Sequence, residues 1–155
     1  RDRTIFLTYY EKRAAKARTR SNAKRLLDYL IENQIESIIL SGHVTDKILA
    51  HLKRLGIENY FSTVLANTDV VTAYKKRNKQ EKLELYIKSK NIKPREVLVV
   101  GDSLEEIEIS KELGILSAAI TDGNVSTSRL KKAKPDYLIS DLGNLINIIK
   151  EINTA

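Results

Sequence analysis

The sequence contains no cysteine, no methionine and no tryptophan, and its 155 residues include only two prolines. Without cysteine there is no disulfide framework and no thiolate metal site, which agrees with a reducing cytoplasm. No apolar run approaches the roughly 20 residues of a membrane-spanning helix, and no signal-peptide pattern opens the chain. Because a natural reading frame starts with methionine, we expect the true N-terminus to lie before Arg1. We therefore predict a cytoplasmic protein without membrane contact.

The length and composition indicate one domain. With 155 residues, of which 42% are hydrophobic, the chain can bury a proper core but is too short for two. It contains no internal repeat, low-complexity tract or linker that would mark a boundary. We therefore predict a single domain over residues 1–155.

The net charge of +7 comes from the N-terminal part of the chain. The later residues carry equal numbers of basic and acidic side chains, so they are neutral overall. The basic segment is either a solvated helix face or a patch that attracts a polyanionic substrate or nucleic acid. No stacking aromatic pair or recognised nucleic-acid motif decides between these interpretations. Against Asp2 and Glu11, the first 25 residues hold nine basic side chains: Arg1, Arg3, Lys12, Arg13, Lys16, Arg18, Arg20, Lys24 and Arg25.

Segments with strand and helix patterns alternate along the chain. Such alternation predicts an α/β fold, a three-layer Rossmann-like and mainly parallel sheet with helices on both faces. Residues 5–10 form a further short apolar piece. The predicted strands are 37–40, 61–66, 97–100, 116–120 and 137–139, and the predicted helices are 21–33, 45–55, 79–90, 104–113, 126–133 and 141–152.

The stretch from Val97 to Glu106 is the most informative part of the sequence. Four apolar residues are followed at once by Gly101, Asp102 and Ser103 and then by a helical pattern. A buried parallel strand would therefore deliver the Asp102 carboxylate to its carboxyl end, which is where open α/β sheets bind ligands. The alternative is that Asp102 or Ser103 only caps the following helix.

Three further positions are expected at the same edge of the sheet. Ser41 follows the strand 37–40, Lys79 opens a helix after the strand 61–66, and Asp2 lies at the start of the chain. A hydroxyl, an ammonium and at least two carboxylates meeting at one edge can bind a phosphate group and the Mg²⁺ that neutralises it.

The order of these residues resembles motifs II, III and IV of the haloacid dehalogenase (HAD) superfamily of phosphatases. The motifs are Ser41-Gly42, then Lys79, then Gly101-Asp102-Ser103-x-x-Glu106. The tail 133–139 with its final helix is also similar to the end of that fold, so the likeness covers nearly the whole chain.

The first motif of that family is Asp-x-Asp-x-Thr after the first strand, and this chain opens with Arg1-Asp2-Arg3-Thr4. An aspartate directly before Arg1 would complete the motif. We therefore expect that the sequence begins one residue after the nucleophile and lacks the first strand. The alternative is that residues 1–4 are an ordinary polar N-terminus.

The resemblance implies a role for each matched residue. The missing aspartate would attack a phosphate ester and form an aspartyl-phosphate. Asp2 would act as general acid and base, and its backbone carbonyl would face the metal. Ser41 and the amide of Gly42 would bind phosphoryl oxygens, Lys79 would neutralise developing charge, and Asp102 would coordinate Mg²⁺.

Two of these assignments have alternatives. Motif IV usually places an aspartate where this chain has Glu106, with Glu105 beside it. Either carboxylate could reach the metal or orient Lys79. The alternative is that both belong to a solvated first helical turn. Lys79 has rivals in the basic residues 75–77. His43 is a candidate catalytic base, although rim or substrate contact is the commoner role for such a residue.

The spacing between the motifs leaves no room for a cap domain, so the resemblance is to capless members. Their open sites either admit large phosphorylated substrates or are covered by another subunit. In the second case this chain would be part of a homo-oligomer. We predict a Mg²⁺-dependent phosphomonoesterase acting on a phosphorylated small molecule or a polyanionic substrate, with a basic surround that includes residues 9–25. The alternatives are a non-catalytic HAD-like domain that binds a phosphorylated ligand and a module that binds nucleic acid.

Overall fold

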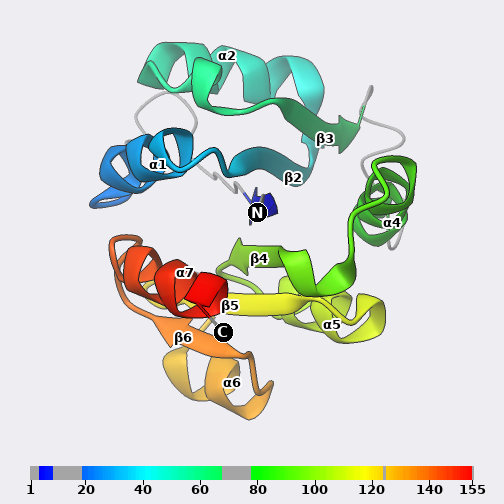
Figure 1. The fold of residues 1–155 in the computed structure, drawn as a ribbon, viewed down its shortest axis with the longest axis vertical. Helices are drawn as coiled ribbons and strands as arrows, with labels where there is room; N and C mark the ends of the chain where they lie inside the picture. Colours follow the sequence, from blue (N-terminus) through cyan, green and yellow to red (C-terminus); the bar gives the residue numbers. More distant parts are fainter. Residues whose placement is uncertain (1–3, 9–18, 68–77, 124, 155) are drawn as a thin grey trace.

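The computed structural model describes residues 4–8, 19–67, 78–123 and 125–154, which build a parallel sheet between layers of helices (Figure 1). Each strand pairs with its neighbours in parallel, in the order β3-β2-β1-β4-β5-β6. The predicted fold class is confirmed. The six strands are β1 (Thr4–Thr8), β2 (Glu36–Val44), β3 (Thr63–Asn67), β4 (Val97–Gly101), β5 (Leu116–Ile120) and β6 (Tyr137–Ile139).

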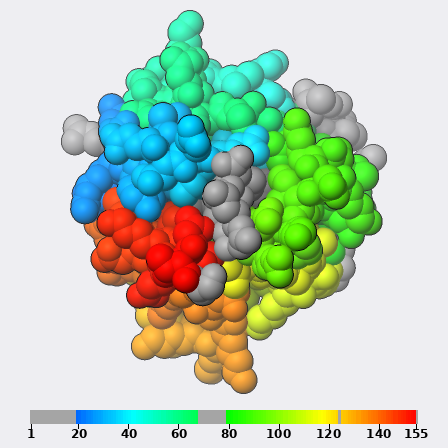
Figure 2. Space-filling model, viewed as in Figure 1, coloured from blue at the N-terminus to red at the C-terminus, as the bar shows by residue number. Residues whose placement is uncertain are grey.

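The helices cover both faces of the sheet. α1, α2 and α7 pack on one face, and α4 and α5 pack on the other. Figure 2 shows α1 and α7 side by side on the surface, in agreement with the contacts between them. The α-helices are α1 (Ala23–Glu32), α2 (Thr45–Leu55), α4 (Asn78–Ser89), α5 (Leu104–Leu113), α6 (Thr127–Lys132) and α7 (Asn144–Thr154), and two 3₁₀ turns are η1 (Glu58–Tyr60) and η2 (Pro94–Glu96).

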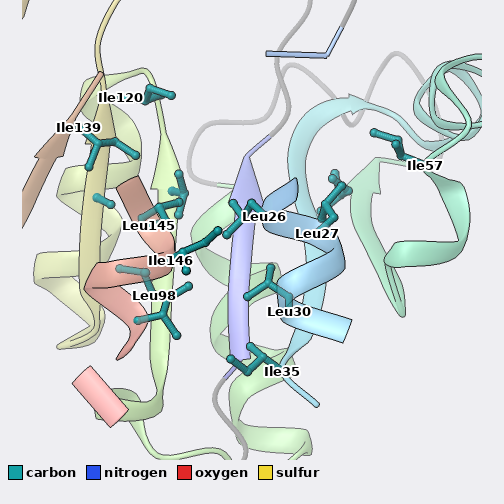
Figure 3. Close-up of a cluster of buried hydrophobic side chains, with 14 of the residues drawn as sticks. Leu26, Leu27, Leu30, Ile35, Ile57, Leu98, Ile120, Ile139, Leu145 and Ile146 are labelled. Carbon is teal, nitrogen blue, oxygen red and sulfur yellow. The ribbon is translucent and has the colours of Figure 1, made fainter. Parts of the chain in front are cut away.

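The four apolar residues of β4 explain why this strand lacks an alternating pattern. Leu98 and Val100 point into the cluster beneath α1, α2 and α7, whereas Val97 and Val99 point into the cluster beneath α4 and α5. A strand covered on both faces needs apolar side chains at every position. Figure 3 shows the first of these clusters, to which side chains of α1 and α7 contribute.

Two glycines end helices where the sequence predicts an end. Gly56 follows α2 with φ 72°, and Gly114 follows α5 with φ 71°. Glycine adopts this left-handed conformation without the steric cost that a Cβ atom brings. Both helices therefore have the predicted C-terminal boundaries.

Three strands differ from the sequence prediction. β3 begins at Thr63 and includes Asn67, whereas the prediction is 61–66. β2 continues past residue 40 to Val44, with an irregular register between Leu40 and Val44. The strand that lies between β2 and β4 is β1, Thr4–Thr8, whereas the sequence predicts only a short apolar piece over residues 5–10 and a first strand before Arg1. The run is too short for its pattern to reveal a central strand, whereas pairing on both sides does so.

Among the described residues, no helix is both long enough and apolar enough to cross a membrane.

Candidate active site at the carboxyl edge of the sheet

Polar residues stand at the carboxyl ends of four strands. Ser41 lies in the last half of β2, Asn67 ends β3, Asp102 follows β4, and Thr121 follows β5. Because the strands are parallel, these positions share one edge of the sheet. This is the edge at which the sequence predicts a phosphate and metal site.

The end of β3 holds the predicted phosphate-binding segment in place. Ser41 is 1% exposed, and its Oγ accepts a hydrogen bond of 3.0 Å from the backbone N–H of His43. Asn67, with no exposed surface, donates from Nδ2 to the Gly42 carbonyl at 2.8 Å. The Asn67 carbonyl in turn accepts a 3.0 Å hydrogen bond from the Thr45 hydroxyl. The Ser41 hydroxyl keeps its own proton and can donate it to an anion.

Lys79 brings an ammonium group to the same edge from the opposite helical layer. It is the second residue of α4, and its Nζ lies 3.0 Å from Glu106 Oε1 and 3.1 Å from Glu105 Oε1. A Cβ atom placed on Gly42 would lie 3.8 Å from Lys79 Cε, so the lysine stem passes beside Gly42. The structure therefore joins the predicted motifs II and III.

The surroundings of Lys79 favour its charged form. Burial lowers the pKa of Lys79, but attraction to the Glu106 and Glu105 carboxylates and hydrogen bonds to them outweigh burial, so the pKa lies above the ordinary 10.5. The charge is therefore present throughout the neutral pH range and acts in a site where water screens it weakly, since the side chain is 12% exposed.

Glu106 contacts Lys79, and its predicted role as a metal ligand stays a prediction. It is 2% exposed; its Oε1 accepts from Lys79, and its Oε2 accepts from the Ser103 hydroxyl. Both carboxylate oxygens thus have partners on the protein. Of the alternatives for motif IV, this geometry supports the orientation of Lys79, and we use Glu106 below as a positioning residue.

Asp102 lies beside Arg20 and a glycine loop. Its side chain is 18% exposed, and its Oδ2 is 3.5 Å from the Arg20 Nη2. The Arg20 Nη1 donates to the Thr121 carbonyl at 3.1 Å. A Cβ atom on Gly123 would lie 2.7 Å from the Asp102 Cβ, so only glycine fits there without displacing Asp102.

Asp102 suits a magnesium ion as a single carboxylate ligand. Within the described ranges, no group of three Asp, Glu, His or Cys side chains is placed to hold a metal. Mg²⁺ is usually held by one or two carboxylates, and waters and substrate phosphates complete its shell. The donor chemistry of Asp102 therefore fits this ion.

Residues 2–120 match the family model for haloacid dehalogenase-like hydrolases. The chain belongs to this family. It is 27% identical over 114 residues to a phosphoglycolate phosphatase of Synechococcus elongatus, covering 74% of this chain and 51% of that protein. It is also 27% identical over 123 residues to the pyrophosphatase PpaX of Oceanobacillus iheyensis, covering 79% of this chain and 56% of that protein. The chain thus spans little more than half the length of these relatives.

Solved structures share the fold. A haloacid dehalogenase-like hydrolase from Streptococcus pneumoniae superposes with a TM-score of 0.69 at 17% identity, covering 83% of this chain and 59% of that chain. An uncharacterised protein from Listeria monocytogenes reaches 0.74 at 17% identity and covers 99% of both chains.

Several predicted positions lie outside the described residues. These are Asp2, the basic residues 75–77 that are alternatives to Lys79, and most of the basic segment 9–25, so their roles stay predictions. Thr4, the first described residue, pairs with Glu36 and Val97 at the amino ends of β2 and β4. The start of β1 is thus at the edge opposite Ser41 and Asp102, whereas Asp2 itself lies outside the described residues and its role stays a prediction.

Sequence reasoning missed two residues at this edge. The predicted strand 61–66 stops one residue before Asn67, although a polar residue directly after a strand is a signal for such a role. Arg20 was counted only as one of nine basic side chains. Its contact with Thr121 spans 101 residues, and no local pattern reports a contact of that range.

Gly101 offers a test of the arrangement around Glu106. A Cβ atom there would lie 2.6 Å from Glu106 Cγ, so Gly101→Ala must displace this buried carboxylate from Lys79. We expect the free energy of unfolding to fall by about 1–3 kcal/mol, the usual cost of overpacking. In Gly42→Ala the nearest atom is 3.8 Å away, an ordinary contact, so chemical denaturation should show a clearly smaller loss. Equal losses would contradict the close packing at Gly101.

Proposed function

We propose that this protein is a Mg²⁺-dependent phosphatase that hydrolyses a phosphate monoester of a small molecule at the carboxyl edge of the sheet. The observation that carries the proposal is the Lys79 ammonium, held by the buried Glu106 carboxylate and lying beside Gly42. A charge that is fixed before the substrate binds stabilises the transition state without a cost of reorganisation.

Ser41 and Lys79 are proposed to bind the phosphoryl group together. The Ser41 hydroxyl donates to one phosphoryl oxygen, and backbone amides at the start of α2 favour the anion, as helix N-termini do. The Lys79 ammonium, whose side chain passes beside Gly42, neutralises negative charge on the phosphoryl group. The hydrogen bonds from Asn67 and Thr45 keep this segment in one conformation, which preserves the alignment of its donors.

Asp102 is proposed to hold Mg²⁺, which when bound neutralises the phosphoryl oxygens. The family resemblance implies an aspartate nucleophile and an aspartyl-phosphate intermediate, and we include both in the proposal. We assign the nucleophile to no residue of this chain. Glu106 and Glu105 hold the Lys79 ammonium in place for the phosphoryl group.

The relatives narrow the proposed substrate class. One is named for phosphoglycolate and the other for pyrophosphate, both small phosphorylated anions. Arg20 and Lys79 reach the carboxyl edge from opposite layers of the fold, which suits an anion bound between them. These observations favour a small molecule over nucleic acid as the substrate.

The test is the hydrolysis of p-nitrophenyl phosphate by the purified protein, with Mg²⁺ and then with excess EDTA. We expect release of nitrophenol that requires the metal and is inhibited by inorganic phosphate. If a folded sample releases none, the assay is repeated with phosphoglycolate and pyrophosphate. A folded protein that hydrolyses none of the three yet binds phosphate would be a phosphate-binding domain, and the proposal of catalysis would be wrong.

A further inference from the structure

Arg20 places a positive charge beside Asp102, the carboxylate proposed to hold the metal. Its Nη2 is 3.5 Å from Asp102 Oδ2, and its Nη1 donates to the Thr121 carbonyl at 3.1 Å. The guanidinium therefore bridges the ends of β4 and β5 by one hydrogen bond and one ion pair. A planar guanidinium can make both contacts at once, whereas an ammonium has no such fork.

A guanidinium and a magnesium ion are both attracted to a carboxylate and repel each other. Among the described residues there is no group of three Asp, Glu, His or Cys side chains that could bind the metal elsewhere. The metal therefore competes with Arg20 for Asp102. The Arg20 side chain is 37% exposed, and a partly exposed ion pair of this kind is weak because water screens it. A divalent cation can therefore replace the Arg20 guanidinium at Asp102 without unfolding the site.

We propose that Arg20 is an exchangeable counter-ion that occupies Asp102 in the metal-free protein and is displaced when the divalent cation binds. The inference rests on the proposed function in one respect, the assignment of Asp102 as metal ligand. Metal affinity is then set by competition with a residue from the segment before α1, and not by the carboxylate alone. A freed Arg20, still bonded to the Thr121 carbonyl, stays at the edge as a donor for the substrate's phosphoryl oxygens.

Hydrogen bonds next to Arg20 in the sequence hold the start of α1 in place, so the exchange need not move the backbone. Asn22 Nδ2 donates to Asp141 Oδ1 at 2.8 Å, and the N–H of Ala23 donates to the Arg20 carbonyl at 3.1 Å. The start of α1 thus has its own attachment to the segment before α7. Displacement of the guanidinium need move only the side chain of Arg20.

The test is direct binding of Mn²⁺, a paramagnetic substitute for Mg²⁺, measured by electron paramagnetic resonance without substrate. We compare the wild type with Arg20→Gln and with Lys24→Gln. Lys24 is an exposed lysine in the first turn of α1, so its variant loses the same charge nearby. Arg20→Gln is expected to bind Mn²⁺ about three- to tenfold more tightly, since one opposing charge and one competing ion pair are removed. Lys24→Gln should stay within about twofold, because an exposed charge further away is screened.

Unchanged or weaker Mn²⁺ binding by a folded Arg20→Gln would overturn the proposed exchange. An equal gain in affinity in Lys24→Gln would also overturn it, because that result would indicate only a general charge effect. Asp102→Asn separates this inference from the proposed function. If Asp102→Asn binds Mn²⁺ as well as the wild type does, the metal site itself is wrongly placed. If binding depends on Asp102 but not on Arg20, only the exchange is refuted.

Discussion

Asp102→Asn is expected to lower Mg²⁺-dependent turnover by about 10²-fold or more, the scale at which single preorganised electrostatic groups act. The amide keeps the shape of the side chain but removes the negative charge that attracts the metal. The pair with Arg20 is partly exposed, so its loss should change the free energy of unfolding by less than about 1 kcal/mol. The measurements are the rate of phosphate release at saturating Mg²⁺ and the thermal unfolding temperature.

Asp122→Asn is the matched control for this prediction. Asp122 is an exposed aspartate in the loop after β5, with φ 66°, a conformation that asparagine also tolerates. The chemical change is identical, and turnover should stay within about twofold of the wild type because surface substitutions rarely matter. Retained activity in Asp102→Asn would remove Asp102 from the metal site.

Lys79→Met is expected to reduce both activity and stability. Methionine is close to lysine in length but leaves the Glu106 carboxylate, 2% exposed, without its cationic partner. Removal of one partner of a buried ion pair typically costs about 3–5 kcal/mol of the free energy of unfolding. The proposed phosphoryl site also loses its fixed charge, so turnover should fall by about 10²-fold or more.

The double variant Lys79→Met with Glu106→Gln separates these two effects. The second substitution replaces the unpaired buried carboxylate with a neutral amide, so chemical denaturation should show most of the lost stability restored. Turnover should stay low, because no ammonium group faces the phosphoryl group. Recovery of turnover along with stability would contradict a catalytic contribution of Lys79 and leave it a structural role.

The pH dependence of the stability difference between wild type and Lys79→Met follows from the raised pKa of Lys79. A raised pKa in the folded state stabilises the protein fully below the unfolded value of about 10.5 and loses this effect as the pH rises through the folded value. The difference should therefore be constant between about pH 6 and 9 and shrink above about pH 10.5. Denaturation at fixed ionic strength across this range measures it.

The sequence alone determined most of the fold because its signals are local. The unbroken apolar run Val97–Val100 predicts a strand buried on both faces, and Leu98 and Val99 indeed enter different clusters. Glycines in the left-handed conformation end α2 and α5 at the predicted positions. Parallel strands place their carboxyl ends together by geometry, so Ser41, Lys79 and Asp102 could be assigned to one edge before any coordinates.

The tertiary structure decided what each charged group faces. The sequence could not choose between metal and lysine for Glu106, because the pair with Lys79 joins α4 to α5 across 27 residues. Nor could it single out Arg20 among the basic residues of its segment, since the partners Asp102 and Thr121 lie in distant loops. The central place of β1 depends in the same way on pairing with β2 and β4. Local sequence specifies propensity and periodicity, whereas the partners of a charge depend on which chain segments folding brings together.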